Sequence, residues 1–190
     1  MSERPVEGRP GRAGAAEAPP CRAAGTLILA VGDTLRADDG AGAAVLEELR
    51  ESRRLPAAVR LLDAGTAGLD IALTLGEVAR AIIVDAADLG MPAGNWTRLG
   101  GDGLGLVGHH EGSSTHSAGL ADALALGEAL GLLPEELVLY AIQPETLSFQ
   151  EGLSAPVARA VPQVTSAILE ELGRDSTGSS EEEKAWQRSS

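Results

Sequence analysis

The residues best suited to chemistry lie in one acidic turn, residues 32–42, which reads Gly-Asp-Thr-Leu-Arg-Ala-Asp-Asp-Gly-Ala-Gly. The turn carries two adjacent carboxylates, Asp38 and Asp39, and no lysine, so its field favours a cation or a proton over a phosphate. It contains neither the Gly-x-Gly-x-x-Gly pattern of dinucleotide sites nor the Gly-Lys-Ser/Thr ending of a P-loop. One carboxylate of the pair is expected to cap the helix that follows, which leaves the other for binding or catalysis.

Two later carboxylates are predicted to join this turn at one edge of a sheet. Asp63 and Asp85 end the apolar runs 59–63 and 81–85, which are typical of strands. Alternation of strands with helices favours parallel pairing with right-handed crossovers, which places Asp39, Asp63 and Asp85 along one edge. We interpret Asp85 as a turn residue that accepts backbone N–H bonds. For Asp63 that role and a functional one both remain open.

The three histidines of the chain lie within eight residues, in a glycine-rich stretch before a helix predicted over 118–130. His109 and His110 suit a solvated polar loop, whereas Ser117 is a predicted N-cap that fixes His116 at the helix start. An ordered imidazole beside converging carboxylates is a credible metal ligand. A Ser–His pair for nucleophilic catalysis would lack the glycine-flanked turn of a nucleophile elbow.

The elements that position these residues form a predicted α/β domain over residues 25–173. A strand over 26–31 leads into the acidic turn, and strands and helices alternate after it. Residues 1–24 and 174–190 lack periodicity and are expected to be a disordered N-terminal extension and a disordered acidic tail. The remaining predicted elements are an edge strand over 95–99, a strand over 137–142 and a last helix over 155–172. Pro162 predicts a bend or a break in that helix.

Length and composition narrow the class of protein. A chain of 190 residues has the size of a single domain, and an aromatic content of 2% leaves the core to aliphatic side chains. The formal charge of −13 disfavours nucleic acid and anionic membranes as partners. The single cysteine, Cys21, argues for a reducing compartment. No apolar run reaches the roughly 18 residues of a membrane span, so we expect a soluble, cytoplasmic protein.

Five stretches together resemble the hydrogenase maturation endopeptidases, the family that processes the large subunits of nickel–iron hydrogenases. They are the acidic turn, Asp-Ala-Gly-Thr-Ala-Gly at 63–68, Ile-Val-Asp-Ala at 83–86, Thr-His at 115–116 and Ile-Gln-Pro-Glu-Thr-Leu at 142–147. The resemblance covers about residues 26–172. It implies an α/β three-layer sandwich, in which a twisted, mostly parallel five-stranded sheet carries helices on both faces.

The resemblance also implies an aspartic-type endopeptidase that removes a C-terminal extension from the large-subunit precursor after nickel insertion. Carried over position by position, Asp39, Asp63 and His116 form the metal-binding set, and Asp39 or Asp63 is the expected catalytic base. Two carboxylates and one imidazole suit nickel, zinc or iron better than calcium. The ion is expected to be the substrate's own nickel, contacted during recognition, and no nucleotide is involved. Whether His109 or His110 assists stays open.

Three other functions remain as alternatives. A phosphorylated signalling receiver would need a lysine at the end of its fifth strand, and the only lysine, Lys184, lies in the tail. A nucleotide-binding module is disfavoured because the glycine pattern is missing. A non-catalytic metal-binding or chaperone-like relative in hydrogenase assembly would keep the same three ligands, so only a cleavage assay separates it from the protease.

Overall fold

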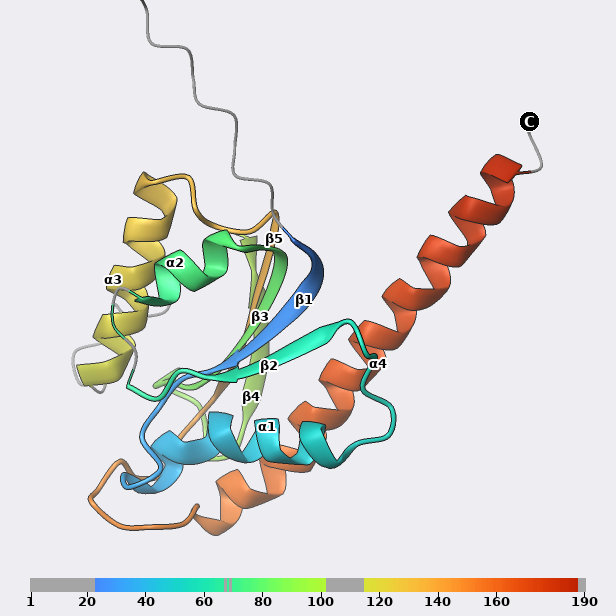
Figure 1. Ribbon diagram of the computed structural model, residues 1–190. Helices are drawn as coiled ribbons and strands as arrows, with labels where there is room; N and C mark the ends of the chain where they lie inside the picture. The colour runs from blue at the N-terminus through green and yellow to red at the C-terminus, as the bar shows by residue number, and fades with distance from the viewer. Residues whose placement is uncertain (1–22, 67, 69, 102–114, 188–190) are drawn as a thin grey trace, which may run out of the picture.

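A five-stranded sheet lies between two layers of helices in the computed structural model (Figure 1). The structure describes residues 23–66, 68, 70–101 and 115–187, and it describes no side chains for residues 23–24, 115–118 and 175–187. Its elements are β1 (Ala23–Ala30), the 3-10 helix η1 (Ala37–Gly40), α1 (Ala41–Glu51), β2 (Val59–Asp63), α2 (Asp70–Gly76), β3 (Val78–Ala86), β4 (Trp96–Gly100), α3 (Thr115–Ala129), β5 (Glu136–Ile142) and α4 (Ala155–Gln187). This arrangement confirms the predicted α/β sandwich.

The sheet has the strand order β2-β1-β3-β5-β4, and β4 is its antiparallel edge strand. The other neighbouring strands pair in parallel. Ala30, at the end of β1, lies opposite Asp63 of β2 on one side and Val84 of β3 on the other. The carboxyl ends of these three strands therefore meet at one edge of the sheet, where ligands bind in open α/β folds.

Aliphatic side chains fill a core on each face of the sheet, as the composition predicted. Ile82 and Val84 of β3 pack against α1 and α4 on one face, whereas Ala81 and Ile83 pack against α2 and α3 on the other. This alternation follows from the two-residue period of a strand. In the part of the chain that the structure describes, no helix is both long and apolar enough to cross a membrane.

A buried ion network fastens α4 to the sheet. Glu171 of α4 accepts hydrogen bonds from Arg80 (2.7 Å), Arg98 (2.7 and 3.0 Å) and the Tyr140 hydroxyl (2.7 Å). Burial alone would raise the pKa of Glu171, but the hydrogen bonds from Arg98 and Tyr140 hold it below its usual range. Glu171 thus stays ionised inside the protein because Arg80, Arg98 and Tyr140 all donate hydrogen bonds to it.

The last helix departs most from the sequence-based prediction. It was expected to end at Leu172 and to bend or break at Pro162, but α4 is one helix that passes through this proline and continues to Gln187. Packing of the buried neighbour Val161 holds the helix to the core at that point. The segment 174–190, expected to be a disordered tail, is thus helical as far as Gln187, and its Glu, Lys and Ala residues are good helix formers. Its distal part extends away from the sheet (Figure 1).

The first strand also begins earlier than predicted. β1 starts at Ala23, inside the segment 1–24 that was expected to be disordered, because Ala23 finds a pairing partner in Val78 of β3. The rest of the predicted extension, residues 1–22, lies outside the described residues.

Helix α1 approaches the strand ends so closely that only glycine fits at position 42. A Cβ atom on Gly42 would lie 2.7 Å from the Val84 carbonyl oxygen and 3.0 Å from the Val31 carbonyl oxygen. Both contacts are with backbone, which cannot rotate away. The glycine therefore sets how tightly the acidic turn and α1 are held against β1 and β3.

We predict that Gly42→Ala lowers the free energy of unfolding by about 1–3 kcal/mol, the usual cost of overpacking. Gly173→Ala is the matched control, because a Cβ at this helical position meets nothing within 4 Å, and it should be neutral or stabilise by about 0.5–1 kcal/mol. Chemical denaturation of both variants measures the difference. Equal stabilities would contradict the close packing of α1.

Candidate active site

The acidic turn buries both of its carboxylates. Asp38 and Asp39 lie in η1 with no exposed surface, and neither caps α1, whose N-cap is Gly40 without a side-chain hydrogen bond. The prediction that one of the pair caps this helix was therefore wrong. Ala37, the first residue of η1, adopts a left-handed φ of 48°, and the carboxylates that follow it enter the protein instead of capping α1.

Asp38 ties the acidic turn to the segment that follows β5. Its Oδ2 accepts hydrogen bonds from the backbone amides of Glu145 (2.8 Å) and Thr146 (3.1 Å), and its Oδ1 accepts one from the amide of Ser154 (2.6 Å). Both of its carboxylate oxygens thus satisfy backbone donors that would otherwise be buried without a partner. Asp38 therefore fixes residues 145–154 beside η1, as the neighbouring traces in Figure 1 show.

Asp39 is oriented by its own turn. Its Oδ2 accepts a hydrogen bond from the amide of Asp33 (2.9 Å). Gly32 makes this turn possible, since it has a φ of 129° and a Cβ there would collide with the Asp39 carbonyl oxygen at 1.9 Å. The Gly32 amide also donates to the Gly65 carbonyl (2.8 Å), which joins the turn to the end of β2.

Asp85 is the buried carboxylate that lies within electrostatic reach of Asp39. It is 1% exposed, and within the described residues neither of its carboxylate oxygens accepts a hydrogen bond of good geometry. Burial, followed by the nearby charge of Asp39, raises the pKa of Asp85 from 3.8 to about 8, and the backbone amide of Ala86 opposes the shift. Asp85 therefore carries a proton at neutral pH, and the prediction that it is an ordinary turn residue was wrong.

Asp63 instead has the turn role that was predicted for Asp85. It is exposed, and its Oδ1 accepts a hydrogen bond from the Gly65 amide (3.0 Å). Asp63 is in register with Ala30, whose side chain packs toward α1 and α4, whereas Asp85 shares the face of Ile83, toward α2 and α3. The two carboxylates therefore start from opposite faces of the sheet, and Asp85 is the one whose pKa the nearby charge of Asp39 raises.

The third predicted ligand, His116, is the second residue of α3, on the face of the sheet toward which Asp85 points. α3 begins at Thr115, so Ser117 lies inside the helix and the prediction that it is the N-cap was wrong. Among the described side chains, no group of three His, Cys, Asp or Glu residues could hold a metal ion, and the His116 side chain is not one of these. His109 and His110 lie outside the described residues.

Two buried carboxylates side by side, one of them protonated, are typical of a site that exchanges a proton or binds a cation. Asp39 and Asp85 supply hard oxygen ligands, and an imidazole from α3 would complete a mixed oxygen and nitrogen set. The sequence patterns did not predict that Asp85 is buried beside Asp39. The signal that could have found it is the strand alternation, which puts Asp85 on the face opposite to Asp63.

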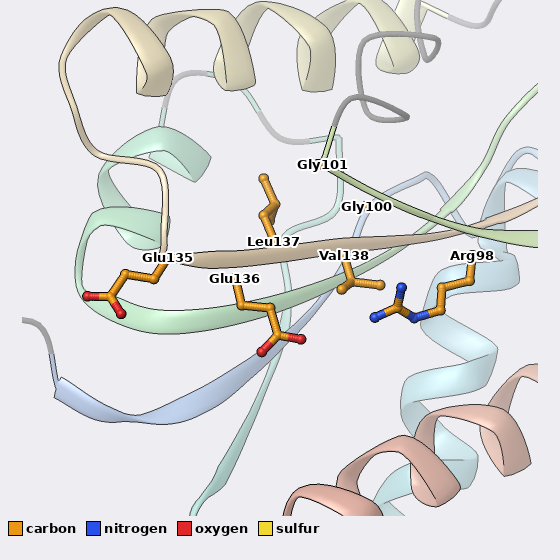
Figure 2. A pocket seen from close by; sticks show the side chains of 7 residues that line it. All are labelled: Arg98, Gly100, Gly101, Glu135, Glu136, Leu137 and Val138. Carbon is orange, nitrogen blue, oxygen red and sulfur yellow. The ribbon is translucent and has the colours of Figure 1, made fainter.

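A pocket of about 490 Å³ lies where β4 ends and β5 begins (Figure 2). It is lined by Arg98, Gly100, Gly101, Glu135, Glu136, Leu137 and Val138. These residues end β4 and begin β5, whereas the acidic turn lies at the carboxyl ends of the parallel strands. The pocket is therefore separate from the candidate active site.

Comparison with known proteins gives consistent matches. The family model HycI, described as hydrogenase maturation protease, matches residues 43–171. The hydrogenase expression/formation protein HoxM of Azotobacter vinelandii is 35% identical over 147 residues, which cover 77% of this chain and 71% of HoxM. The hydrogenase 2 maturation protease of Escherichia coli K12 is 31% identical, over 76% of this chain and 90% of its own. The solved structure of the hydrogenase maturating endopeptidase HybD from E. coli superposes with a TM-score of 0.72 at 28% identity, over 80% of this chain and 93% of HybD.

The raised pKa of Asp85 predicts that the free energy of unfolding falls as the pH rises. The folded protein keeps this proton up to about pH 8, whereas the unfolded chain releases it near 3.8, so rising pH destabilises the wild type across this window. In metal-free protein, the stability of Asp85→Asn relative to wild type should grow by about 1.4 kcal/mol per pH unit between pH 5 and 7. Denaturation at several pH values measures it, and a constant difference between the two proteins would contradict the buried proton.

Loss of the Asp38 acceptor predicts local opening. Asp38→Asn places an amide donor against backbone donors, so we expect a loss of about 1–3 kcal/mol in unfolding free energy. Hydrogen exchange should become faster at the amides of Glu145, Thr146 and Ser154. Asp63→Asn is the control, since its exposed turn bond should change stability by less than about 0.5 kcal/mol. Unchanged protection of the three amides in Asp38→Asn would refute this role.

Proposed function

The chain belongs to the hydrogenase maturation protease family, and from this premise we propose that it removes a C-terminal extension from the large-subunit precursor of a nickel–iron hydrogenase after nickel insertion. Membership makes it a peptide hydrolase of hydrogenase maturation. The substrate, the role of nickel and a cytoplasmic location are the proposed parts. The location rests on the single cysteine and the reducing compartment that it favours.

The observation that carries the proposal is the buried pair of Asp39 and Asp85 at the carboxyl edge of the sheet. We propose Asp39, Asp63 and His116 as the groups that contact the metal, as the resemblance implies, and we add Asp85 as a further candidate because it is buried beside Asp39. Asp63 ends β2 at the same edge of the sheet, where the Gly32 amide of the acidic turn donates to the Gly65 carbonyl (2.8 Å). A set of two carboxylates and one imidazole fits nickel.

Nickel enters this proposal as part of the substrate. Without it, the proton on Asp85 keeps the pair from holding two negative charges in a dry site. A divalent ion seated in the precursor favours the ionised form of both carboxylates, so contact would release that proton. Only a nickel-loaded precursor would then bind in the correct position at the site, so that cleavage depends on completed metal insertion.

Hydrolysis needs a base for the attacking water. We propose that Asp39 accepts the proton of a water whose oxygen bonds to the scissile carbonyl carbon, and that Asp39 then passes this proton to the departing nitrogen as the C–N bond breaks. An aspartate in this role would make the enzyme aspartic in type. Asp63 is the second candidate for the base, because it is exposed at the same edge of the sheet.

The deciding experiment mixes the protein with a candidate large-subunit precursor, with and without nickel, and weighs the products by mass spectrometry. Loss of a C-terminal peptide from the loaded precursor alone is the expected result. Asp39→Asn, Asp63→Asn and His116→Ala should each slow cleavage by about 100-fold or more, and Asp85→Asn tests whether Asp85 also takes part.

Each other outcome has a meaning. Metal binding without cleavage of any precursor would favour a non-catalytic assembly factor. Loss of activity in Asp85→Asn, with Asp63→Asn active, would give the ligand role to Asp85 in place of Asp63. Equal cleavage of loaded and nickel-free precursor would remove nickel from the mechanism.

A further inference from the structure

Two large apolar side chains are exposed beside the candidate active site. Phe149 is 81% exposed and Leu35 is 53% exposed. Leu35 belongs to the acidic turn, and Phe149 belongs to the segment that Asp38 fixes beside it. Arg36 follows Leu35 in the chain, and its guanidinium lies over the Phe149 ring. We call the surface formed by these three side chains the Leu35–Phe149 patch.

Arg36 holds this patch together. Its guanidinium carbon lies 5.6 Å from the centre of the Phe149 ring, a cation–π distance. Its Nε and one terminal nitrogen donate to the Leu147 carbonyl at 3.3 Å each. Arg36 also forms a bridge with Gln150, whose carbonyl accepts a hydrogen bond from the amide of Ala37 (2.7 Å). The ring is therefore exposed to solvent on a fixed support.

The exposure of Phe149 is unusual in this chain. Aromatic residues make up only 2% of the sequence, and Phe149 is its single phenylalanine. The described Trp96 and Tyr140 pack against each other, with ring centres 5.9 Å apart. Burying a phenylalanine stabilises a fold by about 1.5–3 kcal/mol, and the fold leaves this contribution unused. Rigid exposed aromatic and arginine side chains are the residues that dominate binding at protein interfaces.

The position of the patch identifies its partner. Asp39 is fully buried, so a protein substrate must reach it across the residues that surround the turn. Leu35 precedes Asp39 by four residues, at most about 14 Å of extended chain. The patch contributes a guanidinium to the surface of a protein with a net charge of −13, which suits a backbone carbonyl or a carboxylate of an extended peptide.

We propose that the Leu35–Phe149 patch is the docking surface for the hydrogenase large-subunit precursor, and that Phe149 packs on an apolar side chain of the segment next to the cleavage position. This inference rests on the proposed function. It adds a binding surface that neither the buried acids nor the histidine provides.

The test compares Phe149→Ala and Leu35→Ala with Leu130→Ala. Leu130 is the matched control because its exposure of 58% is close to the 53% of Leu35, but it follows the end of α3 near the start of β5, at the opposite edge of the sheet. With nickel-loaded precursor as substrate, the patch variants should raise KM about tenfold and leave kcat within twofold. Phe149→Leu should recover part of the loss, and Leu130→Ala should match wild type.

Direct binding separates this inference from the proposed function. Immobilised precursor should bind wild type and Leu130→Ala equally and Phe149→Ala about tenfold more weakly. If wild type cleaves the precursor and the patch variants keep its KM and affinity, the docking surface is refuted and the function stands. If no protein cleaves the precursor, the function fails, and weaker binding of Phe149→Ala alone would still support the docking surface.

Discussion

Burial of negative charge at one edge of the sheet is the constraint on which the rest of this structure depends. Asp38, Asp39 and Asp85 lie there with almost no exposed surface, and a buried charge is unfavourable unless it is paired, hydrogen-bonded or neutralised. Asp38 accepts three backbone amides, Asp39 accepts the amide of Asp33, and Asp85 keeps its proton. The tight turns around these residues follow from the need to bring those donors inward.

Two buried acids with opposite pKa shifts separate a structural role from a functional one. Burial raises the pKa of both Glu171 and Asp85. For Glu171, hydrogen bonds from Arg98 and Tyr140 outweigh burial, so the ionised side chain serves to fasten α4 to the sheet. For Asp85, the charge of Asp39 adds to the effect of burial. A fold gains nothing from placing two acids together in a dry site, and this favours a function for the pair in binding or proton transfer.

The candidate site and the Leu35–Phe149 patch are carried by the same two segments, the acidic turn and the segment 145–154 that Asp38 holds beside it. The acidic turn supplies Leu35 and Arg36 together with the buried carboxylates of Asp38 and Asp39. Its hydrogen bonds fix the segment that carries Phe149. A protease that acts on a folded precursor needs a surface that recognises the protein and a site that acts on one bond. Their common support would keep the distance between the two constant, which is how a docked substrate is held in a reactive geometry.

The sequence by itself determined the alternation of strands and helices, the aliphatic core, the acidic turn and the resemblance to the hydrogenase maturation proteases. Short-range patterns carry this information, because strand period and turn chemistry depend on near neighbours. Only the tertiary structure decided that Asp85 is buried beside Asp39, since that depends on strand register and on which helices cover which face. It also decided the role of Asp38, whose amide partners lie 107 to 116 residues along the chain. No local pattern encodes contacts at that separation.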